Sequence, residues 1–198
     1  MRSRPGNTDG VVSPLPPPAP AVATLWQTLS RGNRPGPRVR WYIVASSGPG
    51  ALAQSNYCNA VQTGNLVFLA GHLPFDKDGK VITGKLGAGM SVEEGQAAAR
   101  AAALGLVSTL NQHLNGDLER VSRIVKMSAL INCTPDFSMH PAVANGASDT
   151  MVQVFGSAIG SHARCAAGFI SLPLEAAVEV ELIVEVSDDV NASPKAHI

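Results

Sequence analysis

The chain has 198 residues, of which 45% are hydrophobic, and its 15 basic residues balance its 15 acidic ones. This length supports one domain of ordinary size plus some additional chain. The apolar runs fall short of the roughly 20 residues that a membrane-spanning helix needs, which excludes a transmembrane protein. A net charge of zero argues against nucleic-acid binding that depends on overall charge.

The charge is distributed unevenly along the chain. Residues 1–50 carry six arginines against one acid, Asp9, whereas residues 51–198 carry nine basic and fourteen acidic residues. The two parts therefore have net charges of +5 and −5.

The cysteines give no sign of a metal site or a disulfide framework. The three of them lie far apart, without a CxxC spacing or a nearby pair of histidines. We expect all three to be buried thiols in a reducing compartment: Cys58, Cys133 and Cys165.

Residues 1–37 are predicted to form a Pro- and Arg-rich extension outside the fold. Their first twenty residues are rich in proline and lack an apolar period, which is typical of an extended tail. A short amphipathic helix is predicted next, from apolar residues at helical spacing: Val22, Leu25, Trp26 and Leu29. An Arg-bearing, acid-poor leader suits a transit peptide for the mitochondrion or another organelle. The alternative is a solvated linker that docks on its own domain in a cytoplasmic protein.

Residues 38–187 are predicted to form the domain, and residues 188–198 a C-terminal tail. A strand is expected near residues 38–45, which are rich in β-branched and aromatic side chains. Two short strands, 57–61 and 66–70, are separated by turn residues, and a polar turn covers residues 76–80.

A long helix is predicted over residues 91–114. Ser91 and Glu94 have the spacing of a capping box, and the small residues that follow suit close packing on a sheet. Its apolar face is predicted from residues at helical spacing: Ala97, Ala101, Leu104, Val107, Leu110 and Leu114.

The second half of the domain is predicted to contain three strands and one more helix. The strands are 124–133, 164–171 and 178–186, and the helix runs from 141 to 155, where Gly156 ends it. In the last strand, valine and leucine alternate mostly with glutamate, so one face is core and the other is acidic. The order predicts an α+β fold, with two main helices on one face of a mixed sheet. Oligomerisation would bury the surface that two helices leave uncovered.

Arg164 is the residue whose chemistry asks for an explanation, because the motifs of cofactor and metal sites are missing. The Gly-rich residues 84–89 lack phosphate-loop spacing, and residues 76–79 lack the distant acidic ligand of a calcium loop. Arg164 begins an apolar strand, so its charge needs either a fixed carboxylate or an incoming anion. From the residues alone, a structural salt bridge to a fixed carboxylate is favoured over an anion-binding site. Three other candidates also have structural interpretations, namely a solvated sheet face for Glu179, a core aromatic for Tyr57 and a helix-terminal polar residue for Asn145.

Four blocks within residues 56–186 resemble the Rid/YjgF family, which is also named for the L-PSP endoribonuclease. They read NYCNAVQTGNLVFLAGHLP, SVEEGQAAAR, RVSRIVKMSALIN and SHARCAAGFISLPLEAAVEVELIVEV. The last block is the most specific, because an arginine begins a strand that is followed by Leu-Pro and then by a V-E-V-E strand. The leader has no counterpart in the family.

The resemblance implies a chorismate-mutase-like fold and a homotrimer with a cleft at each subunit interface. It implies that Arg164 binds a substrate carboxylate, that Gly71 and Asn145 contribute to binding, and that Glu179 or Tyr57 orders the attacking water. The implied reaction is the cofactor-free hydrolysis of reactive enamines and imines, such as 2-aminoacrylate, to 2-keto acids and ammonia.

The chain departs from the family pattern around Gly71. Ala70 replaces the frequent serine before this glycine, and His72 replaces the usual glutamine after it. Residues 55–59 replace the motif Gly-Pro-Tyr-Ser-Gln, and the helix around residues 145–149 is longer. These changes resemble a divergent subgroup of the family.

Three functions therefore stay open. The first is the imine deaminase. The second is a non-catalytic carboxylate-binding trimer, or an assembly subunit whose basic leader docks on a larger complex such as a ribonucleoprotein. The third is an L-PSP-type endoribonuclease, which the net charge of −5 in residues 51–198 disfavours.

Overall fold

The computed structural model describes residues 57–187. The predictions for the extension at residues 1–37, the strand near residues 38–45 and the tail at 188–198 lie outside the described residues. Among the described residues, no helix is both long and apolar enough to cross a membrane.

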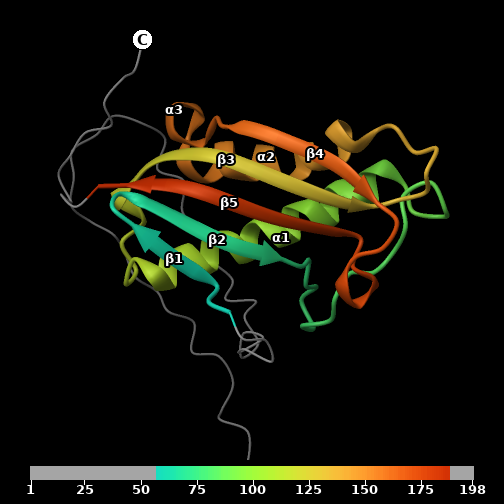
Figure 1. The fold of residues 1–198 in the computed structure, drawn as a ribbon, viewed down its shortest axis with the longest axis horizontal. Helices are drawn as coiled ribbons and strands as arrows, with labels where there is room; N and C mark the ends of the chain where they lie inside the picture. The colour runs from blue at the N-terminus through green and yellow to red at the C-terminus, as the bar shows by residue number, and fades with distance from the viewer. Residues whose placement is uncertain (1–56, 188–198) are drawn as a thin grey trace, which may run out of the picture. The chain divides into compact units, whose positions relative to one another are not determined.

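The described residues form one five-stranded sheet with the order β1-β2-β5-β3-β4 (Figure 1). Its strands are β1 (Ala60–Thr63), β2 (Leu66–His72), β3 (Val121–Asn132), β4 (Ala163–Phe169) and β5 (Val178–Val186). The pair β3 and β4 is parallel, and the other neighbours are antiparallel. This mixed sheet confirms the predicted α+β class.

The helices α1 (Val92–His113), α2 (His140–Phe155) and α3 (Ser157–Gly160) cover one face of the sheet (Figure 1). The capping box that begins α1 is present, because Ser91 Oγ accepts the Glu94 N–H at 3.1 Å and the Glu94 carboxylate accepts the Ser91 N–H at 2.8 Å. Gly156 ends α2 with a φ of 77°. Two short 3-10 turns, Leu118–Arg120 and Pro173–Glu175, lie before β3 and β5.

The core lies between the helices and one face of the sheet. In β5 the side chains at 178, 180, 182, 184 and 186 are buried, and those at 179, 181, 183 and 185 lie on the uncovered face. The predicted alternation is therefore confirmed. The hairpin of β1 and β2 turns at Gly64, whose φ of 57° suits glycine.

The predicted apolar face of α1 was wrong in part, because Ala97 and Leu104 are exposed. Val107 and Leu110 are buried as predicted, and the rest of the buried stripe contains Gly95, Ala98, Ala99, Ala102, Ala103 and Leu106. The helix is rich in alanine on every side, so its apolar pattern fixes no single face. Packing of α1 against both the sheet and α2 decides which residues are buried.

The two long helices approach closely at Gly146 of α2. A Cβ atom at this position would lie 2.0 Å from the Gln96 carbonyl oxygen and 2.9 Å from Gln96 Cα. The Gln96 side chain also donates to the Ala142 carbonyl across the interface, at 2.9 Å. Only glycine fits this crossing without moving a backbone.

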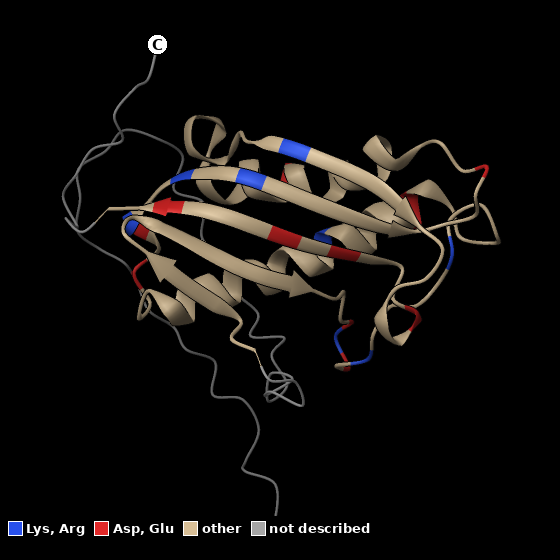
Figure 2. Ribbon diagram, in the orientation of Figure 1, with Lys and Arg blue, Asp and Glu red and all other residues tan. Residues whose placement is uncertain are grey.

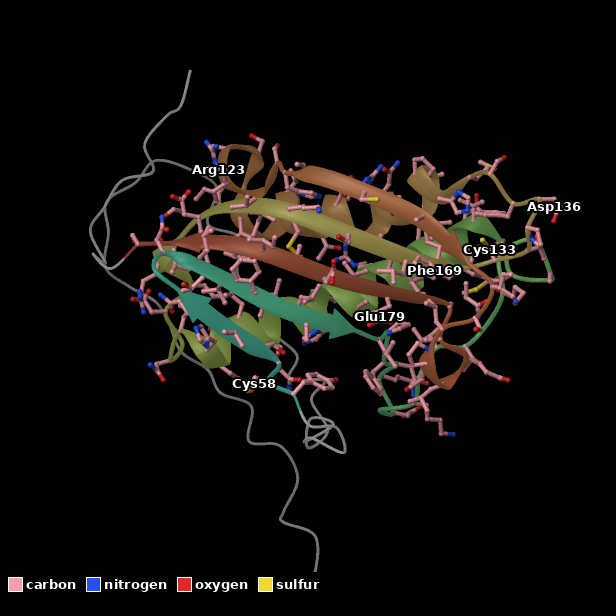
Figure 3. The ribbon with its side chains drawn as sticks, in the orientation of Figure 1. Cys58, Arg123, Cys133, Asp136, Phe169 and Glu179 are labelled. Carbon is pink, nitrogen blue, oxygen red and sulfur yellow. The ribbon has the colours of Figure 1, made fainter. Side chains whose placement is uncertain are left out.

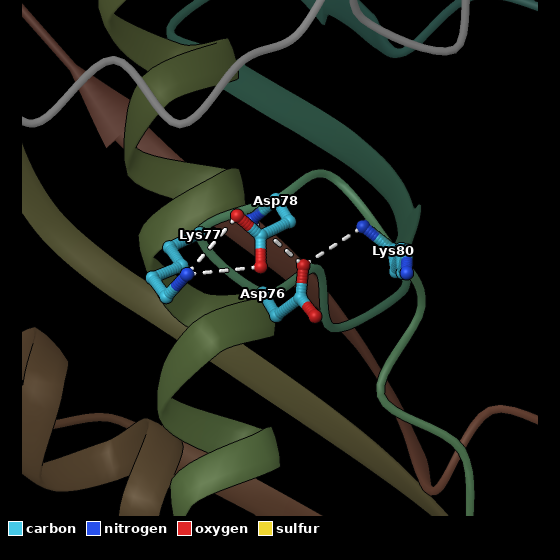
Figure 4. A network of polar contacts seen from close by, with 4 residues as sticks. All are labelled: Asp76, Lys77, Asp78 and Lys80. Atoms are coloured by element: carbon cyan, nitrogen blue, oxygen red, sulfur yellow. Dashed lines mark hydrogen bonds and ion pairs between the residues drawn. The ribbon is translucent and has the colours of Figure 1, made fainter.

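The predicted polar turn at residues 76–80 is confirmed (Figure 4). Asp76 Oδ1 accepts backbone N–H groups from Asp78 and Lys80, each at 2.9 Å. Gly79 has a φ of 75°, and an ion pair of 2.9 Å joins Lys77 and Asp78. The Asp76 carboxylate oxygen is thus used to hold the turn, as in an Asx turn.

The expectation that all three cysteines are buried was wrong for Cys58 and Cys165, which are exposed, whereas Cys133 is buried (Figure 3). Cys165 lies on the edge strand β4, where one side of the strand lacks a neighbour in the sheet. Cys58 lies two residues before the opposite edge strand, β1. All three are free thiols.

Candidate functional site

Arg164 is the second residue of β4, and its side chain lies across α2 on the helix-covered side of the sheet. The strand register pairs it with the buried Met127 of β3. Three oxygens accept hydrogen bonds from its guanidinium: Asn145 Oδ1 at 2.9 Å, Ser148 Oγ at 3.0 Å and the Pro141 carbonyl at 3.2 Å. All three belong to α2, which is the connection between β3 and β4.

The guanidinium is held by neutral groups alone. Within residues 57–187 the one ion pair joins Lys77 and Asp78, so the structural salt bridge considered for Arg164 is not formed there. Two contacts use both N–H groups of Nη1 and a third uses one of Nη2. An N–H on Nε and one on Nη2 remain, and these two nitrogens share one edge of the planar group. That edge can bind a carboxylate with two hydrogen bonds.

Asn145 lies in the second turn of α2, so the interpretation as a helix-terminal residue was wrong. It is exposed, and its oxygen points to Arg164. Pro141 stands in the first turn of the helix, where its missing N–H costs nothing. The Pro141 carbonyl accepts a hydrogen bond from Arg164. Residues 141–145 therefore orient the guanidinium through two contacts, one from Pro141 and one from Asn145.

Sequence reasoning missed two residues behind Arg164, namely Ser148 and His162. Ser148 Oγ lies 3.0 Å from Arg164 Nη1 and 3.0 Å from His162 Nε2. His162 Nδ1 lies 2.6 Å from the Gly160 carbonyl. The spacing in the sequence could have indicated both residues. Asn145 and Ser148 are three residues apart and so share one face of a helix, and residues 162 and 164 are two apart and so point to the same side of an extended chain.

Glu179 lies on the uncovered face, against Gly71. A Cβ atom on Gly71 would fall 1.8 Å from Glu179 Oε1, so the absence of a side chain there leaves room for the carboxylate. Burial raises the pKa of Glu179, and the like charge of Glu181 raises it further. Glu179 is therefore half-buried rather than a fully solvated residue of the sheet face.

Arg164 and Glu179 do not meet within one chain. The register places Arg164 opposite Met127, on the helix side, and Glu179 opposite Leu130, on the uncovered side. Three residues along the sheet and two strands across it separate their Cα atoms by roughly 14 Å. Figure 2 shows basic residues on β3 and β4 and acidic residues along β5.

Tyr57 precedes β1 and is 57% exposed, so its interpretation as a core aromatic was wrong. A cavity of about 290 Å³ lies on the uncovered face. Its lining includes Cys58, which follows Tyr57 in the sequence, together with Phe68, Lys126 and Glu181. Figure 3 shows Glu179 and Phe169 toward the same end of the sheet, in agreement with their partners Leu130 and Asn132 on β3.

His72, which follows Gly71, fixes the end of β2 to α1. Its Nδ1 lies 2.8 Å from the Ala70 carbonyl, so Nδ1 carries the proton, and its Nε2 lies 2.7 Å from Thr109 Oγ1. Burial lowers the pKa of His72, against the opposing effect of the Ala70 hydrogen bond. The register shift between Leu69 and His72 thus lies beside a half-buried imidazole that is hydrogen-bonded at both ring nitrogens.

Residues 57–187 contain no cluster of three or more histidine, cysteine or carboxylate side chains placed to hold a metal ion. The arrangement offers an exposed arginine held by neutral oxygens on one side of the sheet and a carboxyl group of raised pKa on the other.

Comparison with known proteins identifies relatives over most of the domain. The family model described as "YjgF/chorismate mutase-like, putative endoribonuclease" matches residues 46–186. Protein TCP17 of Trypanosoma cruzi is 48% identical over 138 residues, which are 70% of this chain and 86% of that protein.

Two solved structures resemble the described fold. A protein of unknown function from Agrobacterium tumefaciens is 36% identical, with a TM-score of 0.65, and the match covers 67% of this chain and 83% of that chain. A "putative endoribonuclease" from Shewanella oneidensis is 32% identical, with a TM-score of 0.64, and the match covers 68% and 87% of the two chains.

Proposed function

Since the chain belongs to the YjgF/chorismate mutase-like family, we propose that it hydrolyses small carboxylate-bearing enamines and imines to 2-keto acids and ammonia, without a cofactor. The observation that carries the proposal is the state of Arg164. Its guanidinium is fixed by three neutral oxygens and keeps two N–H donors on one edge. A charged, oriented and exposed fork of this kind suits a planar carboxylate.

The proposed site lies between subunits of a homotrimer. Arg164 and Glu179 project from opposite faces of one sheet, so a site that uses both needs Glu179 from a neighbouring copy. The uncovered face supports such an assembly, because it presents apolar side chains such as Phe68 and Phe169 to solvent in the single chain.

The proposed roles follow from charge and position. Arg164 binds and orients the substrate carboxylate, and Asn145 holds the arginine in place. Glu179, with its raised pKa, exchanges a proton with the attacking water or the leaving amine, and Gly71 leaves the space that its carboxyl group occupies. Tyr57 is exposed, and its proposed role is to carry a proton or to contact the substrate in the same cleft.

Arg164→Ala tests the proposal. Charge-assisted hydrogen bonds contribute about 1.5–3 kcal/mol, so kcat/KM for an imino acid generated in situ should fall roughly 10- to 100-fold. Arg164→Lys keeps the positive charge but loses the two parallel N–H donors, so its kcat/KM should lie between those of the wild type and Arg164→Ala. Arg100→Ala is the matched control, because Arg100 is another exposed arginine held by a neutral amide, at 2.7 Å from Gln153 Oε1. Unchanged ammonia release by Arg164→Ala, with the trimer intact, would reject the deaminase.

The same experiment addresses the other two candidates. A trimer that binds 2-keto acids through Arg164 yet releases no ammonia would be the carboxylate-binding subunit. The descriptions of the family and of the Shewanella oneidensis relative as putative endoribonucleases favour the endoribonuclease. The glutamates on the uncovered face of β5 disfavour an RNA phosphate backbone there. Cleavage of labelled RNA by tag-free protein, lost in a single-site variant, would revive that function.

A further inference from the structure

Strand β2 contains a bulge directly before its end. The register of β2 with β5 is regular up to Leu69 and resumes at His72. In between, Ala70 and Gly71 of β2 lie opposite one residue of β5, Glu181. A bulge with two residues against one bends its strand and re-aims the side chains around it, and such bulges are common next to active sites.

The bulge decides which side of the sheet the last residues of β2 take. Leu69 is buried on the helix-covered side, so an unbroken strand would turn Gly71 to that side and His72 to the uncovered face. The extra residue reverses this. His72 pairs with the buried Val180 and contacts α1, whereas Gly71 lies against the Glu179 carboxyl on the uncovered face. The bulge therefore provides the space that the Glu179 carboxyl occupies.

The imidazole of His72 holds the bulge from both ring nitrogens. Its Nδ1–H donates to the carbonyl of Ala70, a bulge residue, at 2.8 Å. Its Nε2 accepts from Thr109 Oγ1 of α1 at 2.7 Å, so the bulge is tied to the helix. We propose that His72 is a positioning residue of the Glu179 site, because it fixes the bulge against which the Glu179 carboxyl packs. This inference rests on the proposed function and deepens it.

The surroundings of Glu179 make its pKa a measure of the bulge. Burial raises this pKa most, and the like charge of Glu181 raises it further. The other charged side chains on β5 and on its neighbour β3 are Arg123, Lys126 and Glu185. A bulge that loosens would admit water to the Glu179 carboxyl and reduce the effect of burial. The pKa of Glu179 should then fall toward its ordinary value.

The bulge can affect the reaction without affecting substrate binding. In the proposed site the substrate carboxylate binds Arg164 of a neighbouring copy, whereas the bulge adjoins the Glu179 carboxyl. A displacement of about 1 Å in a catalytic group can cost on the order of 100-fold in rate. Loss of the His72 contacts should therefore lower kcat and leave KM nearly unchanged.

The test compares three variants of the bulge with the wild type. His72→Leu removes both hydrogen bonds of the ring, Thr109→Val removes the partner on α1 and keeps its shape, and His72→Gln keeps an amide that can reach Thr109. His113→Leu is the matched control, because His113 also ties α1 to a strand, with Nε2 at 3.1 Å from Gln62 Oε1 of β1. Carbon-13 NMR measures the pKa of the Glu179 carboxyl, with Glu179→Gln for assignment. Kinetics with an imino acid generated in situ give kcat and KM, and Thr109→Val decides if His72→Leu does not fold.

We expect the pKa of Glu179 to fall toward the ordinary glutamate value in His72→Leu and, by less, in Thr109→Val, and to stay in place in His72→Gln and His113→Leu. We expect kcat to fall roughly 10- to 100-fold in His72→Leu, while KM changes less than about threefold. A wild type without turnover would reject the proposed function, and the titration would still decide the role of His72. An unchanged pKa of Glu179 in both folded His72→Leu and Thr109→Val, or an equal shift in His113→Leu, would overturn the positioning role.

Discussion

Replacing Gly146 by alanine should destabilise the protein, although the same change usually stabilises a helix. In a helix interior, Gly→Ala contributes about 1 kcal/mol of stability. At Gly146 the added Cβ would lie 2.0 Å from the Gln96 carbonyl oxygen, whereas protein Cβ atoms essentially never come within 3.0 Å of another heavy atom. The helices α1 and α2 would have to separate by about 1 Å to relieve this contact, the difference between those two distances.

The expected magnitude follows from three contributions. Overpacking of this kind costs about 1–3 kcal/mol. Separation of the helices also weakens the hydrogen bond from Gln96 to Ala142, worth about 1 kcal/mol. After the gain in helix propensity, Gly146→Ala should lower the free energy of unfolding by about 1–3 kcal/mol.

Gly105→Ala is the matched control, because Gly105 lies inside α1 and its added Cβ would meet His72 Cδ2 at an ordinary 3.5 Å. This variant should be more stable than the wild type by about 1 kcal/mol. Urea unfolding measures both variants at one protein concentration, so that the proposed assembly would affect both equally. A Gly146→Ala variant as stable as the wild type would refute the close crossing of α1 and α2.

Two further predictions concern pH. Burial raises the pKa of Glu179, so its contribution to stability is present below the ordinary glutamate pKa and is lost as the pH rises through the folded-state value. Glu179→Gln should therefore gain stability over the wild type at neutral pH, and the gap should close in acid; denaturation curves that stay parallel at all pH values would contradict this. Burial lowers the pKa of His72, so its contribution is present above the ordinary histidine pKa and is lost as the pH falls through the folded-state value. The wild type should lose more stability than His72→Gln on acidification from neutral pH, in the same urea assay, and an equal loss would argue against a buried neutral imidazole.

Local signals account for the parts of the fold that could be predicted. The alternation in β5, the capping box of Ser91 and the turn at Gly64 each depend on neighbouring residues, and all three are present. The buried face of α1 could not be predicted in the same way, because alanine suits every side of the helix. The position of α2 decided it, and α2 is distant in sequence.

The sequence suggested candidate residues for the site but not their arrangement in space. The resemblance pointed to Arg164 and Glu179, yet a pattern of residue types does not state which face of a sheet an edge strand presents at a given position. The register with Met127 and Leu130 resolves this, and it places the two on opposite faces. Ser148 and His162 escaped notice because each is an ordinary polar residue until Arg164 lies beside them.

The guanidinium of Arg164 takes all its described acceptors from residues 141–148 of α2, which lie 16 to 23 residues before it in the chain. These contacts span at most 23 residues, so α2 and β4 can come together before contacts with more distant strands form. If the proposed trimer forms, a small acid that binds Arg164 and also contacts the neighbouring copy would, by mass action, favour assembly of the subunits that complete its binding site.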